Sequence, residues 1–287
     1  MPWIPRADAL EETKKAFPEL SIDEKVLENW TRNAGECPPT KQRARLGYDS
    51  DLFAKWHGRL RDSLVQLNSE DYLRCMVFAI DAYYQGITHA DFSRGKQRDA
   101  GEFLTNQIQG KLGEIALQKL LSKHGLEIEL DFRVEGQVAS QDIARISTRS
   151  RVWNNPAVNV SIKATKLKNI MLAVTETEAT TPDRRSDVYV LSQVGLFPDH
   201  ILRIIKQGNV IEGLKEISKL IPDFAGIPAR IAGWVTHAQL TEKPALSPIE
   251  IKSAFDVTMA KPNFVLISGQ LTTDWATLKS MIVGPIV

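Results

Sequence analysis

One long helical pattern followed by a series of strand-like runs constrains the fold of this chain most. The helix is predicted from about Glu102 to Lys123, and Gly125 just beyond it is typical of a helix end. This order of helix, strand meander, strand, helix and strand predicts an α/β or α+β class, and we expect α/β. Strands are predicted at 127–134, 142–147, 158–165, 170–175, 187–191, 230–235 and 263–271, and helices at 210–221, from 236 and at 274–281.

The segment before this pattern is predicted to be mostly helical. Ser21 and Glu24 form a capping-box pattern ahead of a short helix that reaches Asn33. Apolar residues at helical spacing predict two more helices at 50–66 and 69–86. We therefore expect an N-terminal helical region over residues 1–95 and a second domain over residues 96–287.

Composition excludes several classes of protein. The 287 residues are 43% hydrophobic and 25% charged, which is ordinary for a globular protein. The net charge is +1, so a surface that binds nucleic acid must be local. Cys37 and Cys75 are too few for a disulfide framework or a zinc cluster. Without a signal-peptide pattern or a long apolar run, we expect a cytoplasmic protein with no membrane partner.

Six basic residues and no acidic residue lie between Asp142 and Glu176. The run that ends at Lys163 alternates apolar and polar residues, so Ser161 and Lys163 share one face of a predicted strand. The turn-rich segment 149–156 allows this strand to pair with the one that begins at Asp142. A carboxylate, a lysine and a cationic rim are what hydrolysis of a phosphodiester needs. The side chains expected to contact DNA are Arg145, Arg149, Arg151, Lys166, Lys168, Arg184 and Arg185.

These motifs resemble the PD-(D/E)xK nuclease superfamily, and within it the type II restriction endonucleases. The resemblance covers roughly residues 110–240. It implies a restriction-endonuclease-like core, with a central mixed sheet flanked by helices. It also implies that Glu114, Asp142 and Lys163 surround one or two Mg²⁺ ions. The motifs that carry it are Gly110 to Ala116, Gln141-Asp142-Ile143, Ser161-Ile162-Lys163, Asp187 to Leu191 and Ile231 to Val235.

Two residues depart from the family pattern. Gln141 replaces a proline, and Ser161 stands where the family usually has an acid. Because a hydroxyl is a weak, uncharged ligand, we expect the missing carboxylate to come from elsewhere, and some relatives with Ser-x-Lys take it from further along the chain. Glu176 and Glu178 both follow Lys163 at a suitable distance, and Glu114 is the other source. The predicted metal ligands are Glu114, Asp142 and Glu176, and the predicted catalytic residues are these three with Ser161 and Lys163.

Each residue also has an ordinary structural explanation. Taken alone, Glu114 is a solvent-facing residue of an amphipathic helix, and Asp142 is a turn residue that begins a strand. Lys163 alone fits the wet face of an edge strand. A rival match at Asp223 and at Glu250-Ile251-Lys252 fits the motif letters better, but a strand, a helical turn and a proline-rich loop separate its two parts.

We therefore expect a Mg²⁺-dependent DNA endonuclease, most simply a type II restriction enzyme that cleaves a short site in double-stranded DNA. Residues 96–287 would then be its catalytic domain, and the helical region 1–95 would serve DNA contact or dimerisation. A homodimer is expected, because cutting both strands of a palindrome needs two sites related by a two-fold axis. One alternative is a repair or structure-specific nuclease of the same fold. The other is a non-catalytic DNA-binding protein whose site has decayed, an explanation that Ser161 favours.

Overall fold

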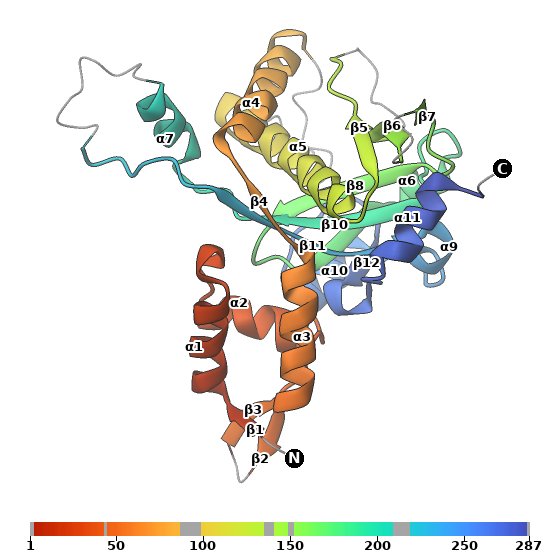
Figure 1. Cartoon of the computed structure of the whole chain (residues 1–287). Helices are drawn as coiled ribbons and strands as arrows, with labels where there is room; N and C mark the ends of the chain where they lie inside the picture. The colour runs from red at the N-terminus through yellow and green to blue at the C-terminus, as the bar shows by residue number, and fades with distance from the viewer. Residues whose placement is uncertain are drawn as a thin grey trace.

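The computed structural model describes residues 3–42, 45–86, 99–134, 141–148, 152–208 and 219–285. Within these ranges the chain is a mixed α/β protein with several β-sheets, one of which combines parallel and antiparallel strands (Figure 1). The class predicted from the order of sequence patterns is thus confirmed. No helix in the described ranges is long and apolar enough to cross a membrane.

Residues 3–63 form an N-terminal module around their own aromatic core (Figure 1, red and orange). Trp30, Phe53 and Trp56 are fully buried there, beside a three-stranded antiparallel sheet in the order β1-β3-β2. The Asp49 carboxylate caps α3, because it accepts the free N–H groups of the first helical turn. The elements are β1 (Trp3–Pro5), α1 (Arg6–Ala16), η1 (Pro18–Leu20), α2 (Glu24–Glu28), η2 (Asn29–Asn33), β2 (Thr40–Gln42), β3 (Arg45–Asp49) and α3 (Ser50–Ser63).

The main sheet has four strands in the order β4-β11-β10-β8. β8 runs parallel to β10, whereas the other neighbours are antiparallel. Because β10 and most of β11 are buried on both faces, their sequences are almost continuously apolar rather than alternating. The strands are β4 (Leu64–Leu67), β8 (Val160–Lys166), β10 (Val188–Val194) and β11 (Ile227–Thr236).

Two layers cover the two faces of the main sheet. Along β10, Val188 and Val190 pack into one layer, whereas Tyr189 and Leu191 pack into the other. The first layer contains α4 (Ser69–Tyr84), α5 (Ala100–Lys123), α7 (His200–Gln207) and α11 (Trp275–Val283). The second contains β9 (Met171–Thr175), α6 (Glu176–Thr180), α9 (His237–Leu240) and β12 (Asn263–Ile267), and α10 (Pro248–Phe255) and η4 (Ser268–Gln270) flank β12 in the chain.

A smaller antiparallel sheet meets the main sheet at one edge. It consists of β5 (Glu127–Leu130), β6 (Ile143–Ser147) and β7 (Trp153–Asn154), in that order. The backbone N–H of Asp142, just before β6, donates to the carbonyl oxygen of Val160 on β8 at 3.2 Å. α5 packs against both β5 and β8, so the helix bridges the two sheets at the point where they touch.

Most predicted elements are present with small changes of their bounds. The predicted long helix is α5, and the predicted strands correspond to β5, β6 and β8 to β12. β4 was not expected, because Leu64 and Leu67 continue the apolar spacing of α3. The helix predicted over 210–221 falls mostly outside the described residues.

The chain passes from one core to the other at β4. Tyr72, Cys75 and Ala79 of α4 lie in the same core as α5, and β4 is a strand of the main sheet. The division predicted at residue 95 therefore does not follow the packing. The buried face of α4 contacts α5, so β4 and α4 pack with the domain that we expected to begin at residue 96.

A buried ion pair fixes the N-terminal module against the main sheet. The guanidinium of Arg230 on β11 contacts the carboxylate of Glu36, and these side chains are only 5% and 6% exposed. Glu36 also accepts hydrogen bonds from the Trp56 indole at 3.0 Å and from the Ser268 hydroxyl. Because a buried charge without partners is costly, separation of these groups is unfavourable. The network therefore holds the N-terminal module, β11 and η4 in one arrangement.

Candidate functional site

Charged side chains from four distant segments lie around the edge of β8, where the small sheet touches the main sheet, with Glu114 on the side of α5 and with Lys163 and Glu178 on the side of α6. They are Glu114 on α5, Asp142 before β6, Lys163 on β8 and Glu178 on α6. The charges of Lys163 and Glu178 both act on the carboxylate of Asp142, and the charge of Asp142 acts on Glu114. We call these four residues, together with Lys111, the carboxylate–lysine cluster.

Glu114 lies on the buried side of α5 and is only 7% exposed. Its Oε2 accepts a hydrogen bond from Nζ of Lys111 at 2.8 Å, and Lys111 also donates to the carbonyl oxygen of Asp131 at 2.7 Å. The Lys111 ammonium lies 4.8 Å and 5.1 Å from the ring centroids of Phe78 and Phe132. The explanation of Glu114 as a solvent-facing residue is therefore wrong, and these contacts hold its carboxylate inside the protein.

Gly113 allows α5 to approach the main sheet closely at this point. A Cβ atom at position 113 would lie 2.6 Å from Cβ of Ala164 on β8 and 3.2 Å from Cβ of Ser192 on β10. A larger residue would force the helix away from both strands. The glycine therefore sets the depth at which the next residue, Glu114, enters the junction between the sheets.

Asp142 is held at the edge of β8 by the backbone. Its own N–H donates to Val160, and its Oδ2 accepts the N–H of Ile162 at 2.6 Å. The carboxylate thus occupies a position on the β8 edge that a strand partner would otherwise take. This geometry explains why Asp142 precedes β6 rather than lying within it, and it leaves Oδ1 free of hydrogen-bond partners within the described chain.

Lys163 forms an ion pair with Glu178, whose Oε1 lies 2.6 Å from Nζ. The two side chains are 30% and 26% exposed, so the pair is open to solvent on one side. Ser161 lies on the same face of β8, two residues before Lys163, and is buried. The structure therefore brings Ser161 and Lys163 to one face, as the alternating pattern predicts.

Glu176, predicted as the third metal ligand, does not join the cluster. Its side chain is exposed at the start of α6, and no described hydrogen bond or ion pair connects it to Lys163. An α-helix turns by about 200° over two residues, so Glu176 and Glu178 point to nearly opposite sides of α6. Glu178, the other acid considered from the sequence, is the one that faces β8.

The carboxyl groups of Glu114 and Asp142 resist ionisation. Burial raises the pKa of Glu114 well above its usual value, and the charge of Asp142 raises it further, whereas Lys111 opposes both effects. Burial also raises the pKa of Asp142, against the hydrogen bond from Ile162 and the charge of Lys163. Two carboxylates that repel each other while largely removed from water are costly, and a cation bound by both would relieve this cost.

The donor set fits one hard divalent cation bound by two carboxylates. Mg²⁺ keeps several water ligands and commonly uses only one or two carboxylates, which Glu114 and Asp142 supply. The described ranges contain no group of three or more His, Cys, Asp or Glu side chains arranged as a metal cage. Gln141, next to Asp142, has a buried Oε1 without a hydrogen-bond partner in the described ranges, which is a further oxygen of the kind that Mg²⁺ prefers.

Basic side chains lie at both ends of the strand that carries Lys163. Lys166 and Lys168 are exposed where β8 ends, and Arg184 and Arg185 are exposed in the turn before β10. Because β8 and β10 are parallel and in register, that turn lies at the opposite end of β8 from the two lysines. Within the part of the chain that the structure describes, these four side chains form no ion pair, so they leave positive charge exposed at both ends of β8.

Arg145 has a partner of its own on the small sheet. Its guanidinium pairs with Glu129 at 2.6 Å and lies 5.7 Å from the ring centroid of the exposed Trp153. Arg149 and Arg151, also predicted to contact DNA, lie outside the described residues.

The rival motif is not assembled. Lys252 lies on helix α10 rather than on a strand and pairs with Asp256 one turn later. Glu250 caps the same helix, and Asp223 pairs with Lys206 on α7. Each of these charged groups already has a hydrogen bond or an ion pair with another residue. The sequence at 222–252 matches the nuclease motif better, but its charged residues do not come together as a site.

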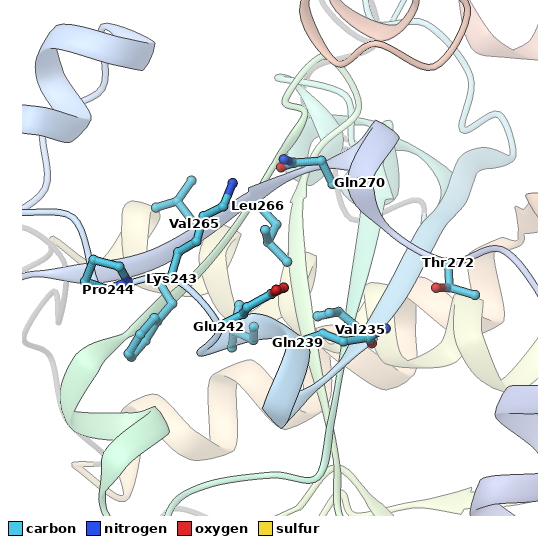
Figure 2. Close-up of a pocket in the computed structure, with 11 residues that line it drawn as sticks. Val235, Gln239, Glu242, Lys243, Pro244, Val265, Leu266, Gln270 and Thr272 are labelled. Atoms are coloured by element: carbon cyan, nitrogen blue, oxygen red, sulfur yellow. The ribbon is translucent and has the colours of Figure 1, made fainter.

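A separate cavity of about 220 Å³ lies in the second layer, between α9 and β12 (Figure 2). Gln239 and Glu242 line one side of it, and Leu266 and Gln270 line the other. No member of the carboxylate–lysine cluster lines this cavity. The carboxylate–lysine cluster and this cavity thus lie in different parts of the structure.

Comparison of the chain with protein-family models, with curated proteins and with solved structures found no match.

Sequence reasoning missed Lys111 as a member of the cluster. Its signal was present, because Lys111 precedes Glu114 by three residues and side chains at this spacing are neighbours on a helix. Glu178 was considered but not chosen, because distance along the chain does not define which face of α6 a side chain occupies.

Proposed function

We propose that the protein is a Mg²⁺-dependent endonuclease that hydrolyses phosphodiester bonds in double-stranded DNA, similar to type II restriction enzymes. The observation that carries the proposal is the position of Asp142 at the edge of β8, between Glu114 on the α5 side of the sheet and Lys163 on the α6 side. Buried carboxylates beside a lysine are costly to maintain, so a purely structural role explains them poorly.

The order of elements also supports a restriction-endonuclease-like core. A helix bearing Glu114 precedes the antiparallel pair β5–β6, with Asp142 at the start of β6. β8 with Lys163 follows, and the chain then passes through α6 to β10, which is parallel to β8. The PD-(D/E)xK resemblance implies this succession of acid-bearing helix, aspartate strand and lysine strand.

Each member of the cluster has a chemical role in this proposal. Glu114 and Asp142 would hold Mg²⁺ through their carboxylate oxygens. A bound ion would supply a more acidic water and would offset charge on the scissile phosphate. Lys163 orients the attacking water through Nζ and neutralises negative charge that develops on the phosphate. Lys111 keeps Glu114 in place through the hydrogen bond at 2.8 Å.

Glu178 replaces the acid that is missing at Ser161. Both residues lie beside Lys163, one on the neighbouring helix and one on the same face of β8. A carboxylate at either position adds the same charge next to the lysine and Asp142. The Ser-x-Lys motif is therefore compatible with activity rather than evidence of a decayed site.

The proposed substrate is duplex DNA, bound along the basic surface that flanks Lys163. Exposed lysine and arginine side chains contact phosphates without reading sequence, which positions the duplex. Cleavage of both strands at a palindrome requires a second copy of the site related by a two-fold axis.

The test is cleavage of plasmid and long linear DNA by the purified protein with Mg²⁺. We expect discrete fragments from the wild type and none from Lys163→Ala, with DNA binding retained because one phosphate contact among many contributes little. Lys252→Ala is the matched control and should cleave normally.

Other outcomes favour the alternatives. Smears or nicks would identify a repair or structure-specific nuclease, and DNA binding without any cleavage would identify a binding protein. Normal cleavage by Lys163→Ala would contradict the assignment of the site.

A further inference from the structure

Helix α4 has an apolar stripe on its outer face. Leu73, Val77, Ile80 and Tyr84 are 45%, 67%, 36% and 83% exposed. They follow one another at intervals of four, three and four residues. Among the described residues they are four of the ten large hydrophobic side chains that are exposed, and no other element contributes more than two.

The opposite face of α4 is already occupied. Tyr72, Cys75 and Ala79 are fully buried against the core that contains α5. A surface helix of a monomer needs only one apolar face, and the other is normally polar. A second apolar face on the same helix indicates a surface that binds another protein.

The spacing of the stripe fits packing against a second helix whose apolar residues have the same spacing. Intervals of four and three residues form the seam along which two helices pack in a coiled coil. In an antiparallel pair, Leu73 would face the partner's Tyr84, and Val77 would face the partner's Ile80. The stripe is thus complementary to itself under a two-fold rotation, which is the property required of a homodimer interface.

Charges beside the stripe favour the antiparallel arrangement. Arg74 and Asp81 both flank the stripe on one edge and are exposed. Arg74 lies over the Phe132 ring at 3.9 Å, and Asp81 accepts only a hydrogen bond from Gln85 among the described residues. An antiparallel pair sets each Arg74 beside the partner's Asp81.

A parallel pair lacks this complementarity. Arg74 and Asp81 would then lie beside the partner's Ser69 and the partner's Met76, which carry no charge.

We propose that a second copy of this chain docks on the outer face of α4, with the two α4 helices antiparallel. This proposal does not depend on the nuclease assignment. Four exposed side chains make a narrow contact compared with the roughly 800 Å² per partner that is typical of stable complexes, so we expect a dimer that dissociates at micromolar concentration.

Sedimentation equilibrium over a range of concentrations tests the interface. We expect a monomer–dimer equilibrium for the wild type and at least a tenfold weaker dimer for Val77→Glu, with equal melting temperatures at concentrations where both are monomeric. Ile249→Glu, at an 81% exposed position on α10, is the control and should dimerise normally.

Two results would overturn the proposal. One is a wild type that remains monomeric throughout. The other is a dimer that Val77→Glu does not weaken. A monomeric wild type whose Val77→Glu variant melts earlier would show instead that the stripe is covered within the same chain.

Cysteine cross-linking tests the orientation. A mixture of Leu73→Cys and Tyr84→Cys chains should form disulfide-linked heterodimers, whereas each variant alone should cross-link poorly. The native Cys37 and Cys75 are buried and do not interfere. Efficient cross-linking of each variant with itself would indicate a parallel pair and contradict the antiparallel model.

Discussion

Replacement of Lys111 by methionine should destabilise the metal-free protein strongly. Methionine keeps most of the volume of the lysine stem but removes its charge. The side chains of Lys111 and Glu114 are 12% and 9% exposed, so the substitution leaves a nearly buried carboxylate without its cation. Breaking such a pair from one side costs about 3–5 kcal/mol. Because the pKa of Glu114 is already raised, uptake of a proton relieves part of this cost.

We therefore expect a loss of about 3 kcal/mol in the free energy of unfolding, measured by urea denaturation at pH 8. The corresponding fall in melting temperature is about 6–12 °C for a chain of this size. A second substitution, Glu114→Gln, removes the carboxylate charge that Lys111→Met leaves without its cation. The double variant should recover most of the loss, with a coupling energy of about 2 kcal/mol.

Lys14→Met provides the matched control. Lys14 pairs with Glu11 at 2.9 Å on α1, with the same separation of three residues, but the side chains are 45% and 73% exposed. An exposed pair of this kind contributes less than about 0.5 kcal/mol. A loss below about 1 kcal/mol in Lys111→Met, or a double variant no more stable than the single, would refute the argument that burial makes this pair important.

Three further predictions concern packing, acid stability and the source of the extra carboxylate. Gly113→Ala should cost about 2 kcal/mol through overpacking against β8 and β10, whereas Gly110→Ala, where an added Cβ meets nothing within 4 Å, should gain about 0.5–1 kcal/mol in the same melts. Burial, helped by the charge of Arg61, lowers the pKa of His57 from 6.5 to about 4. Stability should therefore fall by about 2–3 kcal/mol as the pH drops from about 6.5 to 4, because the unfolded chain gains a proton there first, and urea melts of His57→Phe should lack this component. Glu178→Ala should lose about 100-fold or more in DNA cleavage while Glu176→Ala keeps its rate within about twofold, and equal rates for the two variants would remove Glu178 from the site.

Much of the fold followed from local patterns. The apolar spacing of the long helix and the alternation before Lys163 correspond to α5 and β8 within a few residues. These patterns succeed because helices and strands bury one face at fixed periods. β4 was missed because Leu64 and Leu67 continue the spacing of α3, and its strand conformation depends on pairing with β11, far along the chain.

The site was predictable in its parts but not in its assembly. Asp142 and Lys163 stand on neighbouring strand-like runs, but the expected pairing of these runs is wrong, because β6 and β8 lie in different sheets and the Asp142 N–H bonds only to Val160 at the edge of β8. The choice between Glu176 and Glu178 depends on the start of α6, where Thr175 caps the helix and sets its rotation. Lys111 belongs to the cluster because its ammonium contacts the carbonyl oxygen of Asp131 and the rings of Phe78 and Phe132. These three residues lie in other segments of the chain, so the sequence alone does not predict the contacts.

The central claim is that Asp142 binds the cation that drives hydrolysis of DNA at the carboxylate–lysine cluster. The most direct measurement is the rate of DNA cleavage by wild type and Asp142→Asn across a Mg²⁺ titration, with DNA binding measured in parallel. Asparagine retains an oxygen that can accept the N–H of Ile162, so the backbone contact at 2.6 Å is preserved while the charge is lost. We expect saturable, Mg²⁺-dependent cleavage by the wild type, and none by Asp142→Asn at any Mg²⁺ concentration despite normal DNA binding. Cleavage by Asp142→Asn at the wild-type rate and with the same Mg²⁺ dependence would contradict the claim.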